Sequence, residues 1–298
     1  MRNQGEQALV AGALEARTGW WRALNPAIYL VSILPGVGVW QLSGATGSAS
    51  HALWFATLAV VLLQHSINVL NDVSDWRLGA DAEKWDSWVR AHHENLTLAS
   101  AHGWISFLCG GFLGLGVLIQ TQRLWILAIA LPMVGLGYLY NSGKRPLSYT
   151  RMGEWVTGLC YGPGVVGCLW LLTDTPIDLR CILAMAAFAA LSVALLFSHQ
   201  PPQIESDRQA GKHSFAVRFG ADKTYFASRL LLVIFFVTYG LSLVARSGGL
   251  LIAIYVAAAV IATIFILRKQ PNPKLILMLA TGVVALSLAM TSFYPVIS

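Results

Sequence analysis

Charge is scarce in this chain of 298 residues: Asp, Glu, Lys and Arg make up 11% of it, and 56% of the residues are hydrophobic. A soluble domain carries about 25% charged residues, so the composition excludes an ordinary water-soluble protein. Cysteine is also rare, and no Cys-x-x-Cys pair occurs, which argues against a disulfide framework or a metal site built on thiolates. We interpret the four cysteines as small apolar core residues. They are Cys109, Cys160, Cys168 and Cys181.

What the chain does contain is a series of apolar runs, each long enough to cross a hydrocarbon core of about 30 Å. The sequence therefore predicts an all-α, polytopic membrane protein, a bundle of nine transmembrane helices that forms one domain over residues 1–298. The predicted spans are residues 24–43, 52–74, 101–120, 124–142, 154–173, 181–200, 224–245, 248–267 and 275–296. Residues 1–19 form a polar N-terminal segment without the apolar stretch of a signal peptide.

The basic residues are distributed unequally between the two sides of this predicted bundle. Sixteen of the twenty Lys and Arg residues precede the first span or follow the second, fourth, sixth and eighth spans. By the positive-inside rule these segments are cytoplasmic, which predicts a multi-pass protein of the inner (plasma) membrane with its N-terminus inside. The asymmetry accounts for most of the net charge of +6. We therefore expect anionic headgroups or a phosphate substrate as partners, and no nucleic acid.

A first acidic segment follows the second apolar run. Asn68, Asp72 and Asp75 are four and three residues apart, and this spacing places them on one stripe of a helix, with Asn71 beside them. Grouped oxygen ligands suit Mg²⁺, which prefers carboxylates combined with a phosphate-bearing substrate. The alternative is a solvated helix end whose acidic side chains face water.

A second acidic segment follows the sixth span on the same predicted side. Two consecutive prolines, Pro201 and Pro202, should break or kink the helix there. Gln203 and Asp207 are four residues apart and could share a face, and Arg208 and Lys212 are cations suited to phosphate. Two oxygen-rich clusters that face one another beside basic side chains would hold a Mg²⁺-bridged diphosphate.

The end of the fourth span adds basic and aromatic residues between these two segments. Lys144 and Arg145 are either ordinary cytoplasmic charges or part of the anion site. Tyr138 and Tyr140 precede them, and either ring could face a developing cation through cation–π attraction.

The two segments together resemble the motifs of the UbiA superfamily of intramembrane prenyltransferases, most closely the branch that prenylates 1,4-dihydroxy-2-naphthoate. The first motif is met by Asn68, Asn71, Asp72, Asp75, Gly79 and Asp81. The second is met by Ile204, Glu205, Asp207, Arg208, Gly211, Lys212, Ala216, Val217, Arg218 and Gly220. Two spaced motifs in the right order are far more specific than either motif alone.

The resemblance implies Mg²⁺-dependent transfer of a prenyl group from a polyprenyl diphosphate to an aromatic acceptor, in a lateral cavity that excludes water within the bilayer. It implies catalytic roles for Asp72, Asp75, Asp207 and Tyr140, and a metal site formed by Asn68, Asp72, Asp75, Gln203 and Asp207. The diphosphate would contact Asn71, Asp81, Lys144, Arg145, Arg208 and Lys212. The prenyl chain or the acceptor would contact Tyr138, Asn141 and His199.

One departure from the family pattern concerns the second motif, where Gln203 occupies the position of the usual leading aspartate. An amide oxygen can still bind Mg²⁺, but it carries no charge, so a second ion should bind more weakly unless Glu205 substitutes. Two alternatives remain open at this point. One is a prenyl-diphosphate cyclase or lyase of the same superfamily, and the other is a non-catalytic lipid-binding or transport protein.

Overall fold

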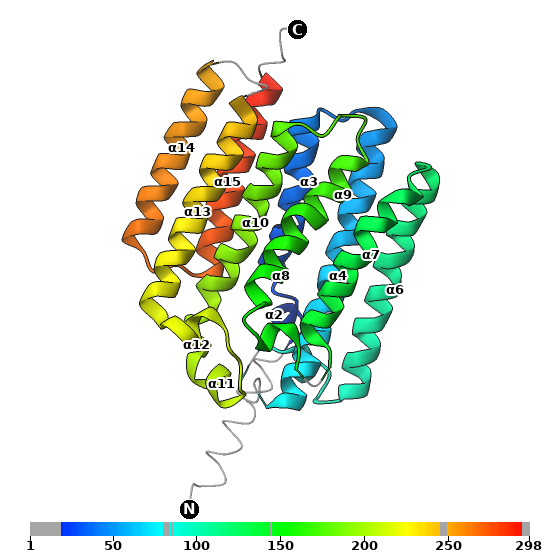
Figure 1. The fold of residues 1–298 in the computed structure, drawn as a ribbon, viewed down its shortest axis with the longest axis vertical. Coiled ribbons are helices and arrows are strands. Elements are labelled where there is room, and N and C mark those ends of the chain that lie inside the picture. Colours follow the sequence, from blue (N-terminus) through cyan, green and yellow to red (C-terminus); the bar gives the residue numbers. More distant parts are fainter. Residues whose placement is uncertain (1–18, 80–83, 85, 144, 245–248, 294–298) are drawn as a thin grey trace, which may run out of the picture.

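The computed structural model describes residues 19–79, 84, 86–143, 145–244 and 249–293, and all regular elements within them are helical. The long helices run side by side in one bundle (Figure 1). They are α3 (Leu30–Ser43), α4 (Gly47–Leu78), α6 (Leu96–Gln120), α7 (Leu127–Asn141), α10 (Leu179–His199), α13 (Ala221–Val244), α14 (Gly249–Arg268) and α15 (Pro273–Phe293). The shorter ones are α2 (Trp20–Leu24), α5 (Trp88–Ala91), α8 (Gly153–Leu159), α9 (Gly167–Leu171), α11 (Ile204–Gln209) and α12 (Phe215–Phe219).

The all-α membrane fold predicted from the sequence is confirmed. Within the described residues, six helices are long and apolar enough to cross a membrane. The remaining three predicted spans correspond to α14, α15 and the segment from α8 to α9, so the count of nine spans stays a prediction.

Two of the predicted spans are interrupted. The first is broken after α2 by Asn25, which adopts a left-handed conformation before Pro26, and a short 3₁₀ turn leads into α3. The fifth consists of α8 and α9 joined by a π-helical segment, Cys160–Val166, that contains Pro163. A proline removes one backbone hydrogen bond and widens the helix locally. At Gly162 the backbone approaches α10 so closely that a Cβ would lie 2.6 Å from the carbonyl oxygen of Met185.

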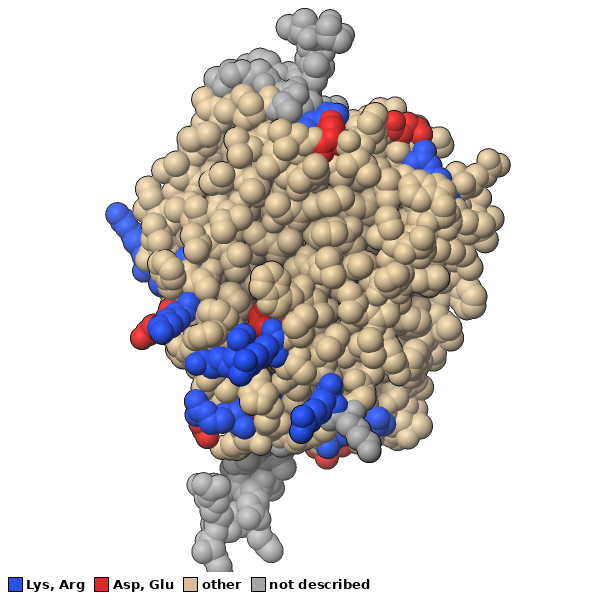
Figure 2. Space-filling model, in the orientation of Figure 1, with Lys and Arg blue, Asp and Glu red and all other residues tan. Residues whose placement is uncertain are grey.

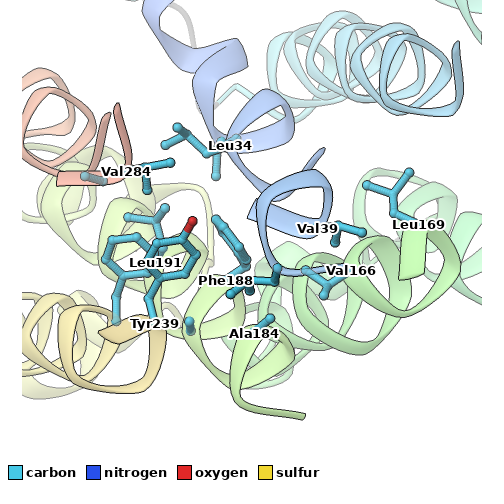
Figure 3. Packing of buried hydrophobic residues seen from close by; sticks show 14 of the residues in the cluster. Leu34, Val39, Val166, Leu169, Ala184, Phe188, Leu191, Tyr239 and Val284 are labelled. Atoms are coloured by element: carbon cyan, nitrogen blue, oxygen red, sulfur yellow. The ribbon is translucent and has the colours of Figure 1, made fainter. Parts of the chain in front are cut away.

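The core lies around α10, which contacts α3, α8, α13 and α15. Small side chains, including Ala184, Ala187 and Ala194, allow the neighbouring helices to approach. Figure 3 shows Phe188 of α10 packed beside Tyr239 of α13, and the two ring centroids are 5.8 Å apart. The Tyr239 hydroxyl donates a hydrogen bond to Gln41 Oε1 at 2.7 Å, so this buried phenol is satisfied.

The surface carries its charge mainly near one end. Figure 2 shows a broad uncharged region across the middle of the molecule, and most of the Lys and Arg visible on this face lie in its lower half. The labels of α11 and α12 lie at the same end in Figure 1. A broad uncharged middle with charges toward the ends is the surface expected of a protein embedded in lipid.

Candidate active site

The first acidic segment lies inside α4 and not at its mouth. The sequence predicted that this span ends near residue 74, but α4 continues to Leu78 and ends at Gly79, whose φ of 81° closes the helix. Asp72 and Asp75 are consequently 5% and 3% exposed. Buried carboxylates require compensating partners, which excludes the alternative of a solvated helix end.

Asp75 receives its partners from three parts of the chain. Its Oδ1 accepts a hydrogen bond of 2.8 Å from the Tyr149 hydroxyl in the 3₁₀ turn Leu147–Tyr149. Its Oδ2 accepts from Asn71 Nδ2 at 3.0 Å and from Lys212 Nζ at 3.1 Å. The carboxylate is therefore held by a phenol, an amide and a cation.

Asp72 faces the segment that follows α4. Lys84 Nζ lies 2.5 Å from its Oδ1, and the backbone N–H of Trp88 donates to its Oδ2 at 2.7 Å. Trp88 opens α5, so this hydrogen bond attaches the short helix to α4.

The second acidic segment is arranged by the prolines at the end of α10. The helix ends at His199, a 3₁₀ turn covers Pro201–Gln203, and α11 begins at Ile204, so the helix is interrupted at the two prolines. Asp207 of α11 is buried, with its Oδ1 3.4 Å from Lys212 Nζ and its Oδ2 accepting from Ser214 Oγ at 3.3 Å. The ammonium group of Lys212 thus contacts both Asp75 and Asp207, and the two acidic segments meet.

A cavity of about 270 Å³ lies between these segments. The predicted site residues in its wall are Asn68, Asn71, Asp75, Tyr140, Asn141, His199, Gln203, Asp207 and Lys212. Asp72 is not itself in the wall, but it forms an ion pair with Lys84, which lines the cavity. The wall also contains apolar side chains, among them Ile28, Val31 and Leu195.

Other predicted residues are not brought to this cavity. Tyr138 is exposed and packs against Trp104, with ring centroids 5.8 Å apart, because positions 138 and 140 face about 200° apart on a helix. Arg208 pairs with Glu205 at 2.8 Å on the exposed side of α11, and Arg145 is exposed. We therefore leave these three residues out of the site. Asp81 and Lys144 were also predicted to contact the diphosphate, and both lie outside the described residues.

The sequence did not predict site roles for Lys84, Tyr149 or Glu154. Lys84 and Tyr149 are loop residues without periodic context, and they reach the acidic side chains only through the tertiary fold. Glu154 is buried, and its Oε1 accepts from the backbone N–H of Phe215 at 2.6 Å and from Gln200 Nε2 at 3.3 Å. It attaches α8 to the segment behind Asp207. Its signal in the sequence was a carboxylate at the first position of a predicted apolar span.

The donors in the wall fit a magnesium ion that arrives with a diphosphate. No three His, Cys, Asp or Glu side chains among the described residues converge as a metal centre. Mg²⁺, however, is usually bound by one or two carboxylates together with substrate phosphates and waters. Asp75 Oδ2 and Asp207 Oδ1 both lie within 3.4 Å of one cationic nitrogen, so the two carboxylates can share a cation.

A model of the UbiA prenyltransferase family matches residues 29–275, which include both acidic segments. The chain belongs to the UbiA prenyltransferase family. Membership makes it an integral membrane prenyltransferase and confirms the resemblance seen in the motifs.

Similar proteins of known sequence include prenyltransferases that act on naphthalene compounds. The chain is 29% identical over 220 residues to the 1,4-dihydroxy-2-naphthoate octaprenyltransferase of Haemophilus influenzae. The aligned region covers 68% of this chain and 70% of that protein. The chain is also 29% identical over 206 residues to the 2-carboxy-1,4-naphthoquinone phytyltransferase of Synechocystis, covering 67% of this chain and 66% of that protein. The matched segments thus span about two-thirds of these relatives.

Solved structures of archaeal UbiA homologues have the same fold. The Aeropyrum pernix homologue superimposes with a TM-score of 0.66 at 14% identity, over 90% of this chain and 98% of that chain. A homologue from Archaeoglobus fulgidus bound to GPP and Mg²⁺ gives a TM-score of 0.64 at 16% identity, over 91% of this chain and 99% of that chain.

Proposed function

We propose that this protein transfers the prenyl group of a polyprenyl diphosphate to a hydroxylated naphthoate, in a Mg²⁺-dependent reaction of menaquinone-type quinone biosynthesis. The observation that carries the proposal is the contact of Lys212 with both Asp75 and Asp207 in the wall of one cavity. Further support comes from the naphthoate prenyltransferases among the relatives and from the homologue whose structure contains GPP and Mg²⁺.

The charged end of the cavity would bind the diphosphate. Asp72, Asp75 and Asp207, with the amide oxygens of Asn68 and Gln203, would hold the Mg²⁺ ion. When bound, the ion would neutralise the charge that develops on the leaving diphosphate. Lys84 and Lys212 would contribute fixed positive charge at the same oxygens, where preorganised cations lower the barrier to C–O cleavage. Asn71 and Tyr149 hold Asp75 in place, so its carboxylate need not reorient during the reaction.

The apolar depth of the cavity would bind the organic part of the substrates. Tyr140 lines the cavity and offers an aromatic ring to the allylic cation, and His199 lines it near the end of α10. Apolar side chains such as Val31 and Leu195 keep water from the cation, and the isoprenoid tail would leave between helices into the bilayer. We also propose that this charged end is cytoplasmic in the inner (plasma) membrane, because the basic loops gather there.

The function is tested with purified protein in detergent, excess Mg²⁺, labelled prenyl diphosphates and a panel of aromatic acceptors. We expect prenylated hydroxynaphthoates in the lipid extract, identified by mass spectrometry, and none when EDTA replaces Mg²⁺. Free prenyl alcohols, olefins or cyclic products without any prenylated arene would contradict the proposal and identify a lyase or cyclase.

A further prediction concerns Gln203, which lines the cavity one helical turn before Asp207. Gln203→Asp should lower the Mg²⁺ concentration for half-maximal rate by about tenfold, which corresponds to roughly 1.4 kcal/mol of additional attraction. Ser206→Asp is the matched control, since Ser206 is exposed in the same segment and its new charge is screened by solvent. An equal change in both variants, or no change in either, would remove Gln203 from the metal site.

A further inference from the structure

Two buried amide side chains in the cavity wall present oxygens that accept no hydrogen bond from any described residue. Gln64 and Asn141 are 7% and 5% exposed, and both line the cavity. Among the described residues, Gln64 Oε1 and Asn141 Oδ1 have no hydrogen-bond partner. Buried polar atoms are nearly always paired with protein, water or ligand, so two orphaned acceptors in one cavity can receive hydrogen bonds from a bound molecule that supplies donors.

The orientation of each amide is fixed by its other end. Gln64 Nε2 donates to the backbone carbonyl of Ile28 at 3.2 Å, and Asn141 Nδ2 donates to the backbone carbonyl of Ile67 at 2.8 Å. Turning either amide over would set its oxygen against a carbonyl oxygen, because a backbone carbonyl can only accept. The second polar atom of each side chain is therefore its carbonyl oxygen, which accepts a hydrogen bond.

The two amides lie within about one turn of each other along α4. Asn141 is attached to α4 at Ile67, three residues after Gln64, which is about 4.5 Å along the helix. Asp72 is eight residues after Gln64, or about 12 Å farther along α4, so the amides lie deeper in the bundle than the acidic groups. An aromatic ring at the amides would thus lie beyond the reacting end of a prenyl diphosphate held at the carboxylates.

We propose that Gln64 Oε1 and Asn141 Oδ1 accept hydrogen bonds from the two hydroxyl groups of a dihydroxylated aromatic acceptor and thereby select it over its quinone. This inference rests on the proposed prenyl transfer. A quinone would bring two carbonyl oxygens against two amide oxygens and leave all four without a donor. The dihydroxylated ring satisfies both amides, and it is also the electron-rich form that attacks an allylic cation.

The test uses 1,4-dihydroxy-2-naphthoate, its two monomethyl ethers and the corresponding quinone, with wild-type protein and the variants Gln64→Met and Asn141→Leu. Each ether lacks one donor, so wild-type protein should discriminate against it by about 5- to 150-fold in kcat/KM. Gln64→Met should abolish the discrimination against one ether, and Asn141→Leu the discrimination against the other. The wild-type protein should not prenylate the quinone.

Discrimination is a ratio of two acceptors on one variant, so a general loss of folding or donor binding cancels from it. Leu196→Met, an apolar exchange in the same wall, should keep both discriminations. Persistence of both discriminations in both amide variants, or prenylation of the quinone at the rate of the dihydroxylated acceptor, would overturn the assignment. Absence of prenyl transfer to every arene by wild-type protein would instead contradict the proposed function.

Discussion

Asp75→Asn should lower turnover by about 10²- to 10³-fold, the loss typical when one preorganised electrostatic contact to a transition state is removed. The substitution keeps the size of the side chain and removes its charge. Asp75 lines the cavity and is the carboxylate held by Tyr149, Asn71 and Lys212, so its loss should weaken both the Mg²⁺ site and the placement of Lys212. Product formation at saturating donor and acceptor, measured by mass spectrometry, gives the change in kcat.

A change in stability must be separated from this loss of activity. Asp174→Asn is the matched control, because Asp174 lies in the loop between α9 and α10 and the Asp174 side chain is 85% exposed. Its ion-pair partner is Arg123. Asp174→Asn should retain wild-type turnover. If Asp75→Asn keeps near-normal kcat at limiting Mg²⁺, Asp75 is not part of the catalytic site.

Lys212→Met should both destabilise the protein and lower its turnover. The ammonium group contacts Asp75 and Asp207, and its side chain is 13% exposed, so its removal leaves two buried carboxylates without their common cation. Breaking such a buried pair typically costs about 3–5 kcal/mol, and we expect the lower end of that range because the acids keep Tyr149 and Ser214 as donors. The loss should appear as a lower Tm in detergent with EDTA.

Magnesium should restore part of this stability, because the ion would occupy the position between the two carboxylates that the lysine vacates. The rise in Tm on adding Mg²⁺ should be larger for Lys212→Met than for wild-type protein or for Lys223→Met, whose lysine is exposed. Turnover should stay about 10²-fold low even with Mg²⁺, since a fixed cation at the diphosphate is missing. Equal responses to Mg²⁺ in all three proteins would contradict the expected replacement of the Lys212 ammonium group by the ion.

Sequence periodicity predicted the parts of the site that lie on helices. The spacing of Asn68, Asp72 and Asp75 depends only on helical geometry, and Pro201 and Pro202 mark the break that turns α11 toward the cavity. The positions of loop residues could not be derived in this way. Tyr149 reaches Asp75 from 74 positions along the chain, and only the packed fold brings them together.

The sequence also could not distinguish side chains that differ only in which helix face they occupy. Tyr138 and Tyr140 are equivalent as a sequence pattern, but only Tyr140 lines the cavity, and Tyr138 faces outward beside Trp104. Gln64 was not singled out because it lies within an apolar run. The role proposed for Gln64 depends on a tertiary contact, because the backbone carbonyl of Ile28 orients the Gln64 amide.

The pairing of Lys84 and Lys212 with carboxylates of the same chain has a consequence for product release. Diphosphate is a multiply charged product, and a site that stabilises it strongly during bond cleavage would also retain it. Here the two lysines form ion pairs with Asp72, Asp75 and Asp207. These carboxylates would compete with the diphosphate for the lysines, and their effective concentration is high because they belong to the same folded chain. In the proposed reaction each lysine would recover an internal counter-ion as the product departs, so the resting ion pairs would lower the free-energy cost of releasing the diphosphate.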